Sequence, residues 1–112
     1  MLQLSMRLIT NGRETINQTS NYFIKDNKMN FKIDDDTYSY DLENDILIKK
    51  NKETSIEINP NEKLIMITLL EQNYTFDMPI IESNLKKEDK LIELTYTFDS
   101  EEKTTNCIII NY

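Results

Sequence analysis

Hydrophobic and polar residues alternate with a period of two over most of the chain. Residues 2–8 carry apolar side chains at every second position, with polar or charged side chains between them. The apolar positions are Leu2, Leu4, Met6 and Leu8. This pattern is typical of a β-strand that is buried on one face only. The same alternation predicts strands at residues 14–25, 29–33, 37–42 and 91–98, three or four more between 43 and 78, and a last one ending in "CIIINY".

Short polar segments separate the expected strands at intervals of roughly eight to twelve residues. The clearest turn is "NPNE" around Pro60. Others are expected at "NGR", "KDNK", "DDD", "NKE", "EQN", "KKED" and "DSEEK". The pattern indicates an all-β fold, a single antiparallel meander over residues 1–112. We expect it to close into a small calycin-like barrel of about 8–10 strands, because closure removes exposed strand edges.

One segment also permits a helix. In "PIIESNLKKEDKLIEL", residues 79–94, several side chains could form a stripe at helical spacing. They are Ile80, Ile81, Asn84, Leu85 and Glu88. The alternation elsewhere in the chain favours strands here too.

The composition restricts the setting of the protein. A chain of 112 residues is long enough for one core, and its formal net charge is −7. The only cysteine, Cys107, cannot form an internal disulfide, which favours the cytoplasm. No apolar stretch approaches the roughly 18 residues of a membrane span. We therefore expect a cytoplasmic, acidic protein without membrane contact.

The missing residue types exclude several kinds of chemistry. The chain has no histidine, so it lacks the base of a Ser-His-Asp or Cys-His site. One cysteine excludes a cysteine zinc cage, and one glycine excludes the glycine-rich loops that bind dinucleotides or phosphates. The acidic pairs fall in turns or on outward positions, where a carboxyl group lacks shelter. The sequence predicts no enzyme, no catalytic residue and no cofactor.

The segment "IDDDTYSYDLENDI", residues 33–46, contains six carboxylates and is the best candidate for a metal site. A helical calcium loop needs oxygen ligands at positions one, three and five and glycine at position six. Counted from Asp34, position six is Ser39; counted from Asp41, it is Ile46. Neither register fits, so we expect solvated turn residues and no dedicated metal site.

All six tyrosines share the parity of the apolar residues in their strands, which predicts that they point into the barrel. Two polar residues of the second strand share this inward parity. Such a lining could form a mixed polar and apolar pocket. The candidate ligand-binding residues are Gln18, Ser20, Tyr22, Tyr40, Tyr74 and Tyr96. The alternative is that the hydroxyl groups reach the open ends of the barrel and are only hydrated.

Two classes of partner follow from these patterns. The first is a small apolar or amphipathic ligand in the barrel, bound without catalysis. The second is a protein: the segment "KLIMITLL", residues 63–70, is apolar on both faces and could lie at a homodimer or partner interface, as could the acidic surface. A weaker third idea is an acidic mimic of nucleic acid. Nucleic-acid binding itself is not expected, because the net charge opposes it and the aromatic residues share the inward parity.

Three segments resemble the YwiB-like family, uncharacterised bacterial proteins with small calycin- or lipocalin-like β-barrels. They are "NYFIKDNKMNFKI", "DILIKKN" and "YTFDMPIIESNL…KLIELTYTF". The resemblance implies a closed or nearly closed barrel and no established activity. The chain departs from the family pattern at two places. Lys49, Lys50 and Asn51 replace an Arg-Gly pair, and Met78 with Pro79 replaces a glycine.

Overall fold

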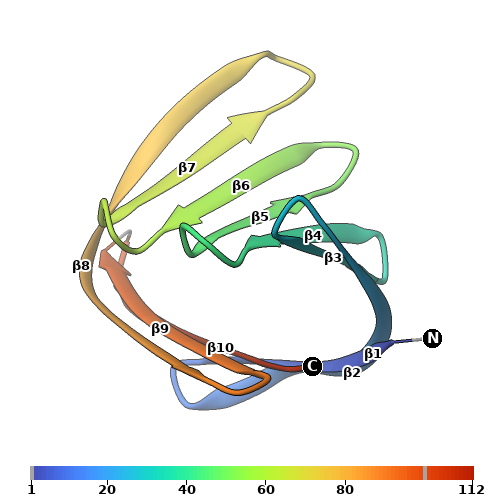
Figure 1. Cartoon of the computed structure of the whole chain (residues 1–112). Helices are drawn as coiled ribbons and strands as arrows, with labels where there is room; N and C mark the ends of the chain where they lie inside the picture. Colours follow the sequence, from blue (N-terminus) through green and yellow to red (C-terminus); the bar gives the residue numbers. More distant parts are fainter. Residues whose placement is uncertain (1, 100) are drawn as a thin grey trace.

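The computed structural model describes residues 2–99 and 101–112, and they form a closed antiparallel β-barrel (Figure 1). The strands are β1 (Gln3–Thr10), β2 (Arg13–Lys25), β3 (Lys28–Ile33), β4 (Asp36–Asp41), β5 (Ile46–Lys50), β6 (Thr54–Asn59), β7 (Leu64–Leu69), β8 (Tyr74–Glu88), β9 (Leu91–Asp99) and β10 (Lys103–Asn111). Each strand pairs with its neighbours in sequence, and β1 pairs with β10 to close the barrel. The expected all-β barrel is therefore confirmed.

Two long strands join the halves of the barrel. The first part of β2 pairs with β1, and its last four residues, from Tyr22 to Lys25, pair with β3. In the same way β8 pairs with β7 up to Pro79 and then with β9. A bulge between Ile80 and Glu82 marks this change of partner. These two strands lie on opposite sides of the barrel in Figure 1, and each bends from one half into the other.

Asparagine, aspartate and lysine make most of the turns. Among the described residues, eight non-glycine residues have positive φ, and six of them are Asn or Asp, whose short polar side chains tolerate the left-handed conformation. Gly12 has a φ of 80° in the β1–β2 turn. With a single glycine in the chain, the turns are built from residues that bond their own backbone. Asp41, for example, accepts hydrogen bonds from the backbone N–H groups of Glu43 and Asn44.

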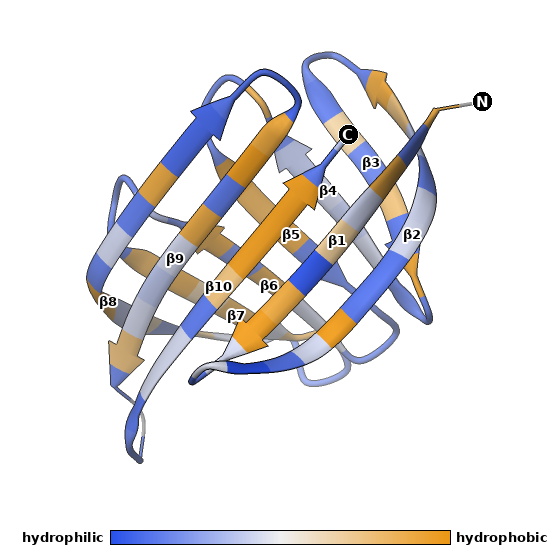
Figure 2. Ribbon diagram, turned by 90° about the horizontal axis from the view of Figure 1, so that it is seen from below, coloured by the Kyte–Doolittle hydropathy of each residue, from blue (hydrophilic) through white to orange (hydrophobic). Residues whose placement is uncertain are grey.

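The inward side chains fill the barrel with an apolar core. Seventeen hydrophobic residues are buried, and they come from all ten strands. Among the largest fully buried side chains are Met6, Met29, Tyr40 and Leu47. Figure 2 shows the source of this core, because apolar and polar residues alternate along β1 and β9. At roughly 25 cal/mol per Å² of apolar surface, burial on this scale is the main stabilising term.

The structure corrects two details of the sequence interpretation. The helical alternative for residues 79–94 is wrong, because β8 continues as a strand to Glu88 and β9 begins at Leu91. The described residues contain no helix, and hence none that is long and apolar enough to cross a membrane. The turn expected at "KKED" lies later, at Asp89 and Lys90.

Residues 64–69 of the doubly apolar segment form β7, which is only partly covered. Only Ile65 is buried, and the other five residues of the strand are half-buried. Leu64 and Met66 lie on the outward face, opposite the inward Ile65 and Ile67. No helix of the described chain lies over them, so this strand leaves apolar surface partly open to water.

Candidate functional site

The candidate tyrosines of the barrel interior are core residues at three positions. Tyr22, Tyr40 and Tyr96 are buried, as is Tyr38, which shares their parity. Phe31 and Tyr38 stack with ring centroids 5.0 Å apart and planes only 2° from parallel. These rings pack against Leu, Ile and Met side chains, so they contribute mainly to the core.

At one end of the barrel, the hydroxyl of Tyr40 donates a hydrogen bond to Asp45 at 3.0 Å. Lys87, from β8, donates to the same carboxylate oxygen at 2.9 Å and to the carbonyl oxygen of Leu42 at 3.0 Å. Burial, reinforced by the Asp45 charge, raises the pKa of Tyr40 far above its usual value of 10.0. Asp45 is therefore not the solvated turn residue expected from the sequence. Its side chain is 17% exposed and joins a buried hydroxyl to an ammonium group.

At the other end, two more tyrosines carry perturbed hydroxyl groups. Burial, with the charges of Asp36 and Asp34, raises the pKa of Tyr38 to about 12. Burial also raises the pKa of Tyr96, whose hydroxyl accepts a hydrogen bond from Asn106 at 3.2 Å. These tyrosines keep their protons throughout the physiological range and act as neutral hydrogen-bonding groups.

The remaining candidates are dispersed. Gln18 is exposed and donates a hydrogen bond to Asp34 at 3.3 Å. Tyr74 has the expected parity but is 58% exposed, because it lies at the tip of the β7–β8 hairpin. Ser20 is half-buried on β2, close to Tyr22 in sequence. Of the six candidates, only Ser20 and Tyr22 line the same depression.

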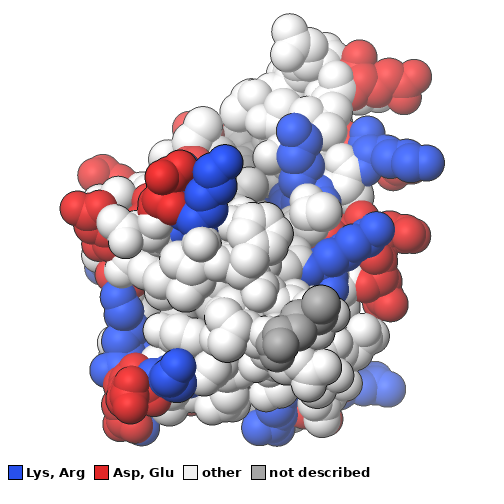
Figure 3. Space-filling model, turned by 45° about the vertical axis from the view of Figure 1, so that its right-hand side comes forward, with Lys and Arg blue, Asp and Glu red and all other residues white. Residues whose placement is uncertain are grey.

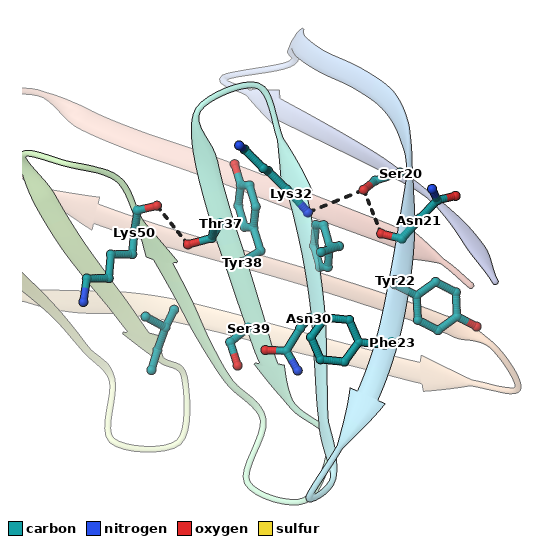
Figure 4. A pocket seen from close by; sticks show the side chains of 12 residues that line it. Ser20, Asn21, Tyr22, Phe23, Asn30, Lys32, Thr37, Tyr38, Ser39 and Lys50 are labelled. Carbon is teal, nitrogen blue, oxygen red and sulfur yellow. Dashed lines mark hydrogen bonds between the residues drawn. The ribbon is translucent and has the colours of Figure 1, made fainter. Parts of the chain in front are cut away.

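That depression is a groove on the outer face of the barrel, across β2, β3, β4 and β5 (Figure 4). Its volume is about 810 Å³. The lining residues are Ser20, Asn21, Tyr22, Phe23, Asn30, Phe31, Lys32, Thr37, Tyr38, Ser39, Ile48 and Lys50. Eight of the twelve occupy the positions between the buried residues of their strands, so their side chains point outward. We call this depression the outer groove.

The strand register arranges the outward residues in rows that cross the four strands. One row runs Phe23, Asn30, Ser39, Ile48, each residue paired with the next across a strand boundary. The adjacent row contains Lys32, Thr37 and Lys50, again paired directly. Phe23 stands at one end of the groove and Lys50 at the other (Figure 4). The groove thus has an apolar residue at each end of one row and an ammonium group on each side of Thr37.

Several polar groups of the outer groove have few protein partners. Lys32 and Lys50 form none of the ion pairs found among residues 2–99 and 101–112. Within the same residues, the Ser39 hydroxyl makes no side-chain hydrogen bond, and the Asn30 amide uses only its N–H group, on the Lys28 carbonyl oxygen at 3.0 Å. Groups of this kind are available to a ligand.

The exposed aromatic ring in the groove contradicts one inference from the sequence. The aromatic residues were expected to point inward, but Phe23 is 60% exposed on the outer face. The signal was present in the pattern, since Tyr22 and Ile24 flank Phe23 and share the opposite parity. Phe23 thus places an exposed aromatic ring beside the amide and hydroxyl groups of the groove.

A smaller depression of about 430 Å³ adjoins the outer groove. It is lined by Lys32, Asp35, Asn51, Lys52 and Glu53 and shares Lys32 with the groove. Its charges are mixed, with two acidic residues among the five. Over the described residues, no three His, Cys, Asp or Glu side chains lie close enough together to hold a metal ion.

Charge is distributed unevenly around the groove. From Asn21 onward, strands β2–β5 have twelve outward residues. Four of them are lysines: Lys25, Lys28, Lys32 and Lys50. Only one, Asp41, is a carboxylate. The chain as a whole has 13 basic and 20 acidic residues. On the side of the molecule that Figure 3 brings forward, basic and acidic side chains project around an uncharged area. The outer groove is thus a basic region on an acidic protein.

Comparison of the chain with protein-family models, with curated proteins and with solved structures found no match.

Proposed function

We propose that the protein is a non-catalytic binding protein whose ligand is a small, partly apolar molecule held in the outer groove. The observation that carries the proposal is the exposed Phe23 ring in a groove of about 810 Å³. Sites for small molecules usually measure roughly 300–1,000 Å³ and combine apolar walls with a few polar groups. The groove has this composition, with Phe23 and Ile48 in one row and Asn30 and Ser39 between them.

The position of the groove supports a ligand on the outside of the barrel. Seventeen buried hydrophobic residues occupy the inside, and the fully buried side chains include Tyr40 and Met29. A ligand in the barrel would have to displace such side chains, at a cost of several kcal/mol for each large one. The candidate tyrosines Tyr22, Tyr40 and Tyr96 then serve to hold the wall on which the groove is built.

The chemistry of the lining supports binding without reaction. No histidine exists in the chain, and neither a carboxylate nor the thiol of Cys107 lines the groove. Its titratable groups are lysines and tyrosines, and burial keeps Tyr38 protonated at neutral pH. The lining therefore lacks the histidine and carboxylate side chains that most often serve as general bases.

The test uses a neutral aromatic probe, naphthalene-1-methanol, and two variants. Phe23→Ala removes the exposed ring and should weaken binding at least fivefold, because the ring supplies most of the apolar contact. Phe76→Ala removes a partly exposed aromatic ring from β8, outside the groove, and should leave binding unchanged. Affinities are measured by fluorescence titration, and amide shifts in NMR spectra locate the probe. Shifts confined to residues outside β2–β5 would refute the proposal.

A second candidate function, self-association, is favoured by a separate observation. Tyr74 and Phe76 form an exposed aromatic pair on the β7–β8 hairpin, with ring centroids 5.9 Å apart. They pair across the strands with Leu69 and Ile67, which are half-buried. We propose a second copy of the chain as the partner, because an apolar face can pair with itself about a twofold axis.

Analytical ultracentrifugation tests this second function. The wild-type chain should sediment as a dimer at micromolar concentration, and the variant Tyr74→Ser/Phe76→Ser as a monomer. A wild-type chain that remains monomeric to 0.5 mM (on the order of the weakest specific dimers) would eliminate self-association.

The cytoplasmic location and the likeness to YwiB-like barrels stay predictions.

A further inference from the structure

We propose that the ligand of the outer groove carries an anionic group, which the ammonium groups of Lys32 and Lys50 bind above Thr37, while its apolar ring lies on Phe23. This inference rests on the proposed function and adds the chemical class of the ligand. The anionic group is a carboxylate or a phosphate, since both chemistries suit a pair of ammonium groups.

The strand register carries the first step. Lys32 and Lys50 both pair directly with Thr37, one from β3 and the other from β5. Neighbouring strands lie about 4.8 Å apart, so the two backbones are separated by about 10 Å. Each lysine stem is about 6 Å long, so both ammonium groups can reach one anion above Thr37. In Figure 4 the two side chains lean in different directions, and rotation about their stems brings them together.

The local charge carries the second step. Two ammonium groups that lie close together repel one another, and an anion between them removes this repulsion. Lysines 49 and 87 have carboxylate partners, Asp36 and Asp45. Lys32 and Lys50, by contrast, form none of the ion pairs of the described residues and line a groove without a carboxylate, although Lys32 also borders the smaller depression that contains Asp35 and Glu53. An anionic ligand supplies the missing partner.

The position of Phe23 indicates where the apolar part of the ligand lies relative to its anionic group. Phe23 pairs with Asn30, and Lys32 lies two residues further along the same strand as Asn30. The ring and the lysine pair are therefore offset diagonally by one row and span the groove. A flat apolar group on Phe23 and an anionic group above Thr37 are consequently parts of one small molecule.

The experiment compares three probes in which a flexible four-carbon chain joins a naphthalene ring to a second group, because Phe23 and Thr37 lie two strands and two residues apart: neutral 4-(1-naphthyl)butan-1-ol, 4-(1-naphthyl)butanoate and 4-(1-naphthyl)butyl phosphate. Wild-type protein at low salt should bind the two anions about five- to tenfold more tightly than the neutral probe. The advantage should shrink as the salt concentration rises, because the ammonium groups are exposed. The carboxylate and phosphate arms identify which anion the groove prefers.

Charge variants separate this inference from the proposed function. Lys32→Gln/Lys50→Gln should abolish the preference for the anions and leave binding of the neutral probe unchanged. Lys32→Arg/Lys50→Arg should retain the preference. The control, Lys86→Gln/Lys103→Gln, loses the same charge from exposed positions of β8 and β10 and should behave as wild type. Circular dichroism and urea unfolding confirm that each variant is folded.

Each outcome has one meaning. If the neutral probe binds in the groove and the anions bind no more tightly, the inference is overturned and the proposed function stands. If the anions bind more tightly but Lys32→Gln/Lys50→Gln keeps the preference, the inference is again overturned, because the anion lies elsewhere. If no probe shifts residues of β2–β5, both fail. Loss of the preference in the Gln variant alone supports the inference.

Discussion

The two faces of β3 and β4 carry opposite kinds of residue although they share one backbone. The inner face holds Met29, Phe31, Tyr38 and Tyr40, all buried. The outer face holds Asn30, Lys32, Thr37 and Ser39, which line the outer groove. The buried hydroxyl of Tyr40 bonds to Asp45, whereas the outer Ser39 hydroxyl makes no side-chain hydrogen bond within the described chain.

Within each of these strands, the inward residues stabilise the fold and the outward residues line the groove. A filled inner face fixes the shape of the wall, and the polar groups on it are mutually satisfied. The outer face presents groups that have few partners within the described chain. In a small barrel that is packed with side chains, the outer surface is where a ligand costs least to bind, because no core residue moves.

The largest expected effect comes from neighbouring residues of β5. Leu47→Ala cuts into the core at a position that is fully buried, and should lower the free energy of unfolding by about 2–5 kcal/mol. Ile48→Ala, one residue later on the outer face, should lower the free energy of unfolding by less than about 1 kcal/mol. It should weaken binding of the neutral probe several-fold. Urea unfolding and probe titration measure the two quantities. Equal destabilisation by both substitutions would break the comparison.

The hydroxyl of Tyr40 provides a smaller test on the inner face. Tyr40→Phe keeps the ring and removes the hydrogen bond to Asp45, so it should lower stability by about 1 kcal/mol. Asp45 retains its contact with Lys87 at 2.9 Å, which limits the loss. Probe binding should be unchanged. A variant as stable as wild type but defective in binding would place Tyr40 in the ligand site after all.

Alkaline pH sharpens the comparison further. The pKa of Tyr38 rises from 10.0 to about 12 on folding, so between these values the unfolded chain has released a proton that the folded chain keeps. The stability due to Tyr38 is therefore present below pH 10 and is lost as pH rises through 12. Tyr40 and Tyr96 shift in the same direction. Urea midpoints from pH 9 to 12 should fall more gently for Tyr38→Phe than for wild type; identical slopes would contradict burial of this hydroxyl.

The smallest effect on stability is expected at Ser39. Ser39→Ala removes an outer hydroxyl without a side-chain partner in the described chain, so the free energy of unfolding should change by less than about 0.5 kcal/mol. Binding of the naphthyl probes should weaken modestly, about two- to threefold, since one neutral hydrogen bond contributes about 1 kcal/mol or less. A loss of stability above 1 kcal/mol would show that the outer face also supports the fold.

The alternating pattern was enough to predict the barrel, because an inward and an outward residue follow one another in nearly every strand. It also placed Tyr22, Tyr40 and Tyr96 on the inner face, where they are buried. Parity alone could not predict that Tyr74 is exposed, since that depends on its place at a hairpin tip. Nor could it predict the role of Asp45, whose φ of 58° belongs to the turn that brings its carboxylate to Tyr40.

The outer groove was missed for a different reason. The shared parity of the tyrosines indicates the barrel interior, whereas Phe23 is the one aromatic residue at outward parity in its strand. The residues of the groove come from four strands, and only the register brings Phe23 into one row with Ile48. Such a row is a property of strand pairing, which the alternation within each strand does not determine.

The pairing of β1 with β10 has a consequence for biosynthesis. Ser5 pairs with Asn111, so β1 obtains its second neighbour only after β10 has been made and has left the ribosome. Until then, β1 presents unpaired backbone groups to other chains. Contacts so distant in sequence also slow folding, since a long loop must close before they form. The chain is therefore most vulnerable to aggregation before β10 joins the barrel, and deletion of β10 would leave it in that state.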